Sequence, residues 1–160
     1  MGAPFFHHKE VCKKNKVTVF SSNFALYANM SDRVMRVLRD FAVKIEVYSV
    51  DEAFLDLSGY VGTKEFPTIE SYARHIKDTV EKQTGIPVGV GVGPTKTLAK
   101  LANFVAKEYP YYKGVVDLMN TELREKVLAK IEVDNIWGVG RSLAPRLRLL
   151  GISTVKDFRD

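Results

Sequence analysis

The stretch Ile45–Leu57, IEVYSVDEAFLDL, constrains the fold of this chain more than any other. Two apolar, β-prone runs, Ile45–Val50 and Ala53–Leu57, flank the adjacent acids Asp51 and Glu52. Neighbouring side chains on a straight strand point to opposite faces of the sheet, so two adjacent carboxylates on one strand cannot share a ligand. If the chain turns at these acids, both carboxylates project from the mouth of a β-hairpin. The pattern therefore predicts strand, turn and strand.

Acidic residues are concentrated in this hairpin against the overall charge of the chain. Glu46 and Asp56 accompany Asp51 and Glu52, although the formal net charge of the whole chain is +5. Hard divalent cations such as Mg²⁺ prefer carboxylate oxygens, so the cluster indicates a divalent-cation site. An ordinary solvated turn explains the spacing equally well, because adjacent acids are common in turns.

Length and composition exclude several classes of protein. With 160 residues, 46% of them hydrophobic, the chain can form one folded domain and a small appendage. A sequence pI of about 9.3 permits nucleic-acid binding without requiring it. The lone Cys12 cannot form an intramolecular disulfide, which favours a reducing cytoplasm, and its spacing from His7 and His8 fits no zinc site. No apolar run approaches the roughly 20 residues that span a bilayer, so we expect no membrane segment.

The order of the expected elements predicts an α+β fold. A β-prone run at Val17–Phe20 precedes a helix over Phe24–Phe41, and a second helix begins near Pro67 and ends at Gly85. Valine alternates with glycine over Pro87–Val92, which is typical of a strand that another backbone approaches closely. Together with the hairpin, the order is strand, helix, strand, strand, helix, strand. This order is that of a ferredoxin-like fold, with two helices on one face of an antiparallel sheet.

The next helix, expected over Pro94–Lys107, has two different faces. Its apolar face packs against the core, and its opposite face is polar. At 100° per residue, the polar face gathers within about 60° the residues Lys96, Lys100, Asn103 and Lys107. A solvated lysine stripe is one interpretation. The other is a row that faces phosphate, because like charges so close repel one another unless an anion neutralises them.

The C-terminal part predicts a helix–hairpin–helix motif. A short strand at Val115–Leu118 and a helix that Thr121 caps and that runs to about Lys130 lead to the sequence IWGVG. An arginine-rich helix over Arg141–Leu150 follows it. Glycines let backbone N–H groups approach a phosphate, and a helix N-terminus attracts anions. Such contacts fix the position of a DNA backbone without reading its sequence. The residues expected at this DNA contact are Gly138, Val139, Gly140 and Arg141.

Three motifs in order, SVDEAFLD, GVGVGPTKTLAKLAN and WGVGRSLAPRL, resemble the Y-family translesion DNA polymerases, especially the UmuC-like (ImpB/MucB/SamB) branch. The resemblance runs from about Ser21 to the end of the chain. It implies a palm over residues 1–118 and a small all-α thumb segment over residues 119–160. Asp51 and Glu52 match the second and third metal-binding carboxylates of the family, and Lys107 matches the lysine that contacts the incoming triphosphate. Lys96 and Lys100 are expected to face DNA.

The resemblance also implies a reaction and partners. The intact enzyme would use two Mg²⁺ ions to transfer nucleotides from dNTPs to a primer 3′ end opposite damaged template, in DNA repair and the SOS response. Primer–template DNA, a UmuD-type dimer, a RecA filament and the processivity clamp would be its partners.

Parts of the family pattern are missing. Its first metal-binding aspartate belongs to an N-terminal strand, but Met1–Phe20 contains no aspartate, and neither the fingers nor the little finger is recognisable. The expectation is therefore an internal fragment that does not extend a primer by itself. Two other classes stay open. A nucleotidyl cyclase with a similar palm has no need for a glycine-hairpin DNA clamp, and a non-catalytic helix–hairpin–helix DNA-binding protein does not explain the acidic turn.

Overall fold

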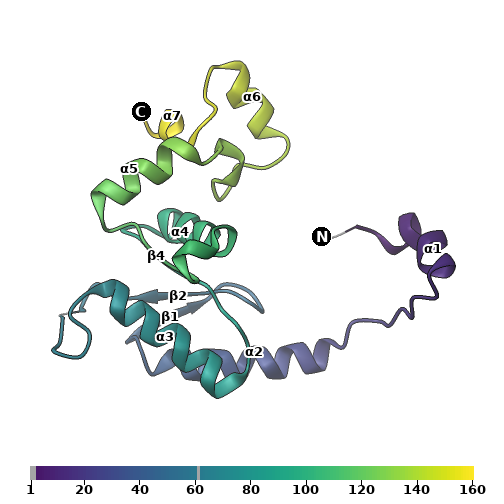
Figure 1. The fold of residues 1–160 in the computed structure, drawn as a ribbon, viewed down its shortest axis with the longest axis horizontal. Coiled ribbons are helices and arrows are strands. Elements are labelled where there is room, and N and C mark those ends of the chain that lie inside the picture. Colours follow the sequence, from purple (N-terminus) through teal and green to yellow (C-terminus); the bar gives the residue numbers. More distant parts are fainter. Residues whose placement is uncertain (1–2, 61) are drawn as a thin grey trace.

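Four strands form two separate two-stranded sheets in the computed structural model, which describes residues 3–60 and 62–160. Strands β1 (Lys44–Val47) and β2 (Ala53–Asp56) pair antiparallel as a hairpin. Strands β3 (Val90–Val92) and β4 (Val115–Asp117) pair parallel and are joined by a helical crossover (Figure 1). The predicted hairpin and the α+β class are confirmed.

Helices make up most of the remaining structure. The C-terminal helices lie at one end of the body, α2 and α3 lie at the other, and α4 lies between them (Figure 1). No helix of the described ranges is long and apolar enough to cross a membrane. The helices are α1 (Phe5–Lys14), α2 (Phe24–Arg39), α3 (Ile69–Thr84), α4 (Lys96–Glu108), α5 (Thr121–Lys130), α6 (Leu143–Leu149) and α7 (Val155–Arg159), with 3-10 turns η1 (Pro110–Tyr112) and η2 (Val133–Asn135).

Local chemistry sets the helix boundaries. The side chains of Asn23 and Thr95 accept hydrogen bonds from the first turns of α2 and α4, as N-cap residues do. Gly85 ends α3 with a φ of 72°, which confirms the predicted stop. The prediction that Thr121 caps α5 is wrong, because the Asn120 side chain accepts the Leu123 N–H at 2.9 Å and Thr121 is the first helical residue.

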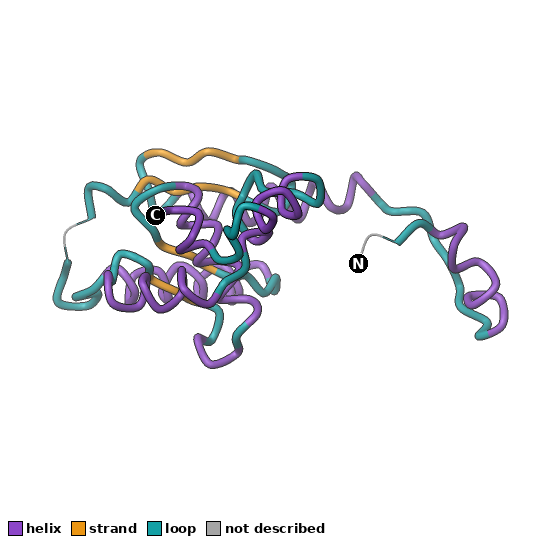
Figure 2. Tube along the Cα trace, turned by 90° about the horizontal axis from the view of Figure 1, so that it is seen from above, coloured by secondary structure: helices purple, strands orange, loops and turns teal. Residues whose placement is uncertain are grey.

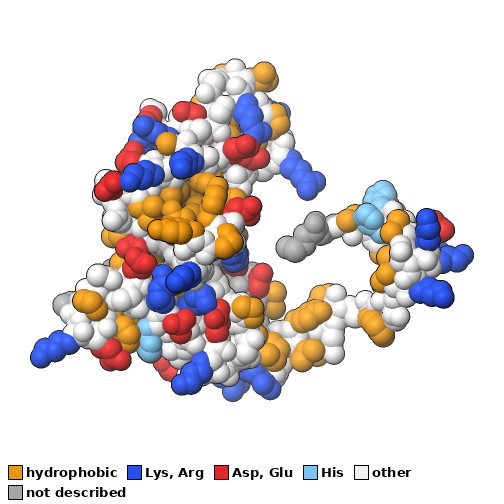
Figure 3. Space-filling view, in the orientation of Figure 1, with side chains coloured by type: hydrophobic (Ala, Val, Ile, Leu, Met, Phe, Trp, Pro, Cys, Tyr) orange, Lys and Arg blue, Asp and Glu red, His pale blue; other side chains and the backbone are white. Residues whose placement is uncertain are grey.

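The N-terminal segment differs from the prediction. Val17–Phe20 is not a strand: it pairs with no other strand in the described part of the chain, so a β-prone sequence alone does not make it one. The hairpin and β3 also belong to separate sheets, so they do not form the one antiparallel sheet of the prediction. Helix α1 precedes this segment, contains no buried residue, and stands away from the body (Figure 2). The space-filling view shows basic and histidine side chains exposed on it (Figure 3).

Helix α4 packs unusually closely on β3 because glycines replace side chains on the strand. A Cβ atom at Gly91 would lie 2.2 Å from the backbone nitrogen of Asn103 and 2.3 Å from the carbonyl oxygen of Ala99. A Cβ atom at Gly93 would lie 2.8 Å from the backbone nitrogen of Ala99. Real Cβ atoms do not approach backbone atoms so closely, so the glycines are required. The predicted close backbone approach is confirmed.

The opposite flank of α4 enters a core that continues into the C-terminal helices. Leu101, Ala102 and Val105 are buried there, as the helical periodicity predicts. The same cluster includes buried residues of β4, α5, η2, α6 and α7, together with Leu118, which follows β4, and Val139, the centre of the glycine hairpin Gly138–Gly140. The glycine hairpin is therefore fixed to the body through the same core that holds α4.

The contact between α4 and β3 makes a prediction about stability. Gly91→Ala should lower the free energy of unfolding by about 3 kcal/mol or prevent folding, since overpacking against backbone atoms cannot be relieved by a rotamer change. Chemical denaturation followed by circular dichroism measures this. Gly59→Ala is the matched control, because a Cβ atom there meets nothing within 4 Å. Equal stability of the two variants would contradict the described packing.

Candidate metal and nucleic-acid site

The turn of the hairpin brings Asp51 and Glu52 to its mouth. The last paired residues are Val47 and Ala53, and the N–H groups of Tyr48 and Ser49 donate to the Glu52 carbonyl oxygen at 3.0 and 3.1 Å. The Ser49 hydroxyl donates to one carboxylate oxygen of Asp51 at 2.6 Å, and Asp51 is exposed. Because that hydroxyl binds Oδ1, Ser49 fixes the orientation of the carboxylate and leaves Oδ2 available to a ligand.

Two lysines of α4 neutralise two acids of the hairpin. The ammonium group of Lys100 lies 2.8 Å from a Glu52 carboxylate oxygen, with the two side chains 24% and 31% exposed. One turn earlier, Lys96 forms an ion pair with Glu46. Repulsion along the lysine stripe is therefore relieved, at these two positions, by carboxylates of the protein itself. The structure thus brings together Glu52 and Lys100, which were predicted for different roles.

Three aromatic rings surround this ion pair. The Trp137 ring lies 5.3 Å from the Tyr48 ring and 5.7 Å from the Phe54 ring, and its indole N–H donates to the Tyr48 hydroxyl at 3.3 Å. The Lys100 ammonium is 5.0 Å from the Tyr48 ring centre and 5.4 Å from the Trp137 ring centre, within the range of cation–π attraction. Sequence reasoning missed the roles of these rings. The only available signal was the single tryptophan of the chain beside the glycine pair.

Lys107 occupies a different position on the same helix. It is exposed, and within residues 3–60 and 62–160 it takes part in no ion pair. The stem of its side chain runs past Gly89, whose ideal Cβ position is 3.3 Å from the Lys107 Cγ atom. Seven residues at 1.5 Å rise place it about 10 Å along the helix axis from Lys100. Lys107 is therefore free to bind an anion without breaking an ion pair.

The glycine hairpin has an anchored centre and open flanks. The Val139 side chain is buried, and its N–H donates to the Ile136 carbonyl oxygen at 2.8 Å. A Cβ atom at Gly138 or Gly140 would meet nothing within 4 Å. In the part of the chain that the structure describes, no hydrogen bond is donated by the N–H groups of Gly138, Gly140 and Arg141. These groups are available to phosphate oxygens, whereas Val139 holds the hairpin in place.

The arginine-rich helix is shorter than predicted. Helix α6 begins at Leu143, because the Gly140 carbonyl oxygen accepts the N–H groups of Leu143 and Ala144, both at 3.0 Å. Arg141 therefore lies before the helix, not in its first turn. At the other end Gly151 takes a φ of 82° directly after the C-cap. The predicted sequence of helix, glycine hairpin and helix is otherwise present, with η2 between α5 and the hairpin.

The turn fits part of a magnesium site. Carboxylate oxygens are the ligands that Mg²⁺ prefers, and Asp51 and Glu52 present them from one turn. Asp56 is engaged elsewhere, because hydrogen bonds from the hydroxyl and N–H of Ser58 lower the pKa of its carboxyl. No group of three or more His, Cys, Asp or Glu side chains that could hold a metal exists among the described residues. The two carboxylates therefore fit a divalent cation as a partial ligand set.

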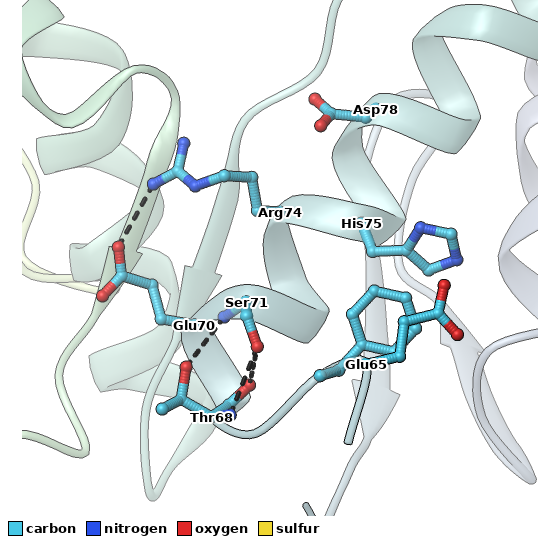
Figure 4. Close-up of a pocket in the computed structure, with 8 residues that line it drawn as sticks. Glu65, Thr68, Glu70, Ser71, Arg74, His75 and Asp78 are labelled. Carbon is cyan, nitrogen blue, oxygen red and sulfur yellow. Dashed lines mark hydrogen bonds and ion pairs between the residues drawn. The ribbon is translucent and has the colours of Figure 1, made fainter. Parts of the chain in front are cut away.

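A depression on α3, about 500 Å³ in volume, lies apart from these residues (Figure 4). Four of its polar side chains already stabilise the fold: Thr68 and Ser71 form the capping box of α3, and Arg74 pairs with Glu70 at 3.2 Å. It contains none of the predicted site residues. The candidate site is therefore the junction of the hairpin, α4 and the glycine hairpin.

Solved structures define the class to which this arrangement belongs. A structure titled "Insertion ternary complex of Dbh DNA polymerase" matches with a TM-score of 0.75 and 32% sequence identity, over 98% of this chain and 43% of that chain. DinB from Sulfolobus solfataricus matches with a TM-score of 0.73 and 32% identity, over 98% of this chain and 43% of that chain. The fold is that of Y-family DNA polymerase structures.

Sequence comparison identifies the family. The model of the impB/mucB/samB family matches residues 1–103, and that of the IMS family HHH motif matches residues 121–152. The chain belongs to the impB/mucB/samB family. It is 44% identical to Protein UmuC of Salmonella typhimurium over 99% of this chain, and 43% identical to Protein SamB of Salmonella typhimurium over 96%. The chain spans 37% and 36% of the lengths of these two relatives.

The two glycines of the hairpin should differ in what they contribute to stability. Gly138 has a φ of 96°, so Gly138→Ala should lower the free energy of unfolding by about 1–2 kcal/mol. Gly140 has no positive φ, and Gly140→Ala should be neutral or slightly stabilising, because alanine restricts the unfolded chain. Thermal unfolding of both variants measures the difference. Equal losses at the two positions would show that the hairpin has another backbone conformation.

Proposed function

We propose that this chain is part of a DNA-directed DNA polymerase that transfers nucleotides from dNTPs to a primer 3′ end opposite damaged template. The observation that carries the proposal is the convergence of three segments on one site: the acidic turn, the lysine face of α4 and the glycine hairpin. Membership of the impB/mucB/samB family supports it. Residues 1–118 would correspond to a palm and residues 119–160 to the start of a thumb.

Asp51 and Glu52 would hold Mg²⁺ in this enzyme. When bound, the metal neutralises charge that develops on the transferred phosphoryl group. Ser49 orients the Asp51 carboxylate through its 2.6 Å hydrogen bond. Lys100 occupies one oxygen of the Glu52 carboxylate, Oε2, which becomes available to a ligand when Lys100 leaves it. Two metal ions require further carboxylates in addition to these two.

The basic groups would bind two different anions. Lys107, which has no ion-pair partner in the described ranges, would contact the triphosphate of the incoming dNTP. The open N–H groups of Gly138, Gly140 and Arg141 would contact the phosphate backbone of the duplex, with Val139 as their anchor. Lys96 and Lys100 would join the DNA contact once they leave their carboxylate partners Glu46 and Glu52.

The biological setting follows from the family. We propose a role in DNA repair during the SOS response, in the cytoplasm, with a UmuD-type dimer, a RecA filament and the processivity clamp as partners. The resemblance to the UmuC-like branch supports these partners. Product analysis separates this function from its rivals, since a polymerase extends a primer, a nucleotidyl cyclase forms a cyclic nucleotide, and a non-catalytic DNA-binding protein forms neither.

Substitution of the acidic turn tests the proposal in the full-length protein. Asp51→Asn and Glu52→Gln should each lower primer extension by more than about 100-fold, because each removes a charged metal ligand while keeping its shape. Duplex affinity should stay within about twofold, because DNA affinity comes mainly from contacts of basic groups with phosphate. Primer extension and fluorescence anisotropy measure the two quantities. Near-normal extension by both variants would refute the metal assignment.

Lys107 gives an independent test in the same assays. Lys107→Ala should raise the dNTP KM or lower kcat and leave the salt dependence of DNA affinity unchanged, because its proposed ligand is the triphosphate. Lys113→Ala is a control of equal charge on the loop after η1. If Lys107→Ala chiefly weakens DNA binding and flattens the log–log salt slope by about 0.9 for each lost phosphate contact, Lys107 belongs to the DNA-binding surface.

A further inference from the structure

Lys100 lies where three functional segments meet. Its ammonium group is 2.8 Å from Glu52 in the acidic turn, and the same atom is 5.0 Å from the Tyr48 ring and 5.4 Å from the Trp137 ring. Trp137 directly precedes the glycine pair of the hairpin. The Lys100 ammonium group therefore contacts both the candidate metal ligand Glu52 and Trp137, the residue that precedes the candidate DNA-binding hairpin.

A metal ion at Glu52 would compete with this partner, because the Lys100 ammonium group already occupies Oε2 of the carboxylate. Mg²⁺ coordinates carboxylate oxygens at about 2.0–2.1 Å and carries twice the charge of an ammonium group. An ammonium that stays near the same carboxylate would be repelled by the metal across a few ångströms. Movement of Lys100 away from Glu52 would relieve this repulsion, and its contacts with the Tyr48 and Trp137 rings would change with it.

We propose that Lys100 is a positioning residue that holds Glu52 in the absence of metal and is displaced when a divalent cation binds, so that metal binding is transmitted to Trp137 and the glycine hairpin. This inference rests on the proposed assignment of Glu52 as a metal ligand. It predicts that Lys100 and the metal compete for one carboxylate. It also predicts that the environment of Trp137 reports the competition.

Lys96 provides a matched comparison on the same helix. It lies one turn before Lys100, forms an ion pair with Glu46, and has its ammonium group 5.2 Å from the Phe54 ring. It has no contact of either kind with Glu52 or Trp137 within the described structure. Removal of the Lys96 charge therefore changes the general electrostatic field near the turn without removing the proposed competitor.

The chain contains one tryptophan, so its intrinsic fluorescence reports Trp137 directly. The experiment titrates the purified chain with MgCl₂ at constant ionic strength, with choline chloride as the balancing salt. It follows tryptophan emission, and it measures Mg²⁺ binding separately by isothermal titration calorimetry. The variants are Glu52→Gln, Lys100→Met, Lys100→Gln and Lys96→Met, each checked for folding by circular dichroism.

In the wild-type chain, emission should change with the same midpoint as calorimetric binding, and Glu52→Gln should abolish both. Without metal, Lys100→Met and Lys100→Gln should already show the emission of the metal-saturated wild type. Their affinity for Mg²⁺ should rise by roughly two- to fivefold, the range expected for loss of a partly exposed ion pair. Lys96→Met should tighten binding less and keep the wild-type emission.

Four outcomes would overturn the inference. In the first, Mg²⁺ binding depends on Glu52 but leaves Trp137 emission unchanged. This result would refute the transmission to Trp137 and leave the metal assignment intact. Weaker Mg²⁺ binding by the Lys100 variants would show that Lys100 supports the site and does not compete. A gain in Lys96→Met equal to that in Lys100→Met would show a general charge effect. Absence of Mg²⁺ binding by the wild-type chain would refute displacement, while the polymerase proposal would still depend on primer extension.

Discussion

The close seating of α4 on the glycine face of β3 determines where the rest of the candidate site lies. Because Gly91 and Gly93 have no side chains, the backbone of α4 lies directly against the strand, and its rotation about its own axis is fixed. One flank of the helix then enters the core with Leu101 and Val105. Another flank carries Lys100 to the mouth of the hairpin. A bulkier strand would move every lysine of this face.

The candidate site and the packing of the hairpin depend on the same contacts. Sheet β1–β2 is small, and Val47 at the end of β1 is exposed, as is Tyr48, the next residue. Its contact with the rest of the molecule near the turn is made by the Glu52–Lys100 ion pair and by the Tyr48–Trp137 ring pair. In the absence of metal and DNA, the groups proposed to bind these ligands therefore hold three segments together that are distant in the sequence. Binding of either ligand exchanges one set of partners for another.

The sequence predicts the helices, strands and turns better than the contacts between them. The turn at Asp51 and Glu52, the stop at Gly85 and the close approach at Gly91 follow from local chemistry, and all three are present. The ion pair of Lys100 joins residues 48 positions apart, and the Trp137–Tyr48 hydrogen bond joins residues 89 positions apart, so no local pattern contains them. Val17–Phe20 shows that a local pattern can also mislead, because strand propensity alone does not form a strand when no other strand pairs with the segment.

The acidic turn, α4 and the glycine hairpin are proposed to form one ligand-binding site. The most direct measurement is a ¹H–¹⁵N spectrum of the chain during addition of a primer–template duplex with Mg²⁺. We expect resonances to shift together in the turn around Asp51, on the lysine face of α4, and in the glycine hairpin, including the indole N–H of Trp137. Shifts confined to one of these segments, or concentrated on α1, would contradict it.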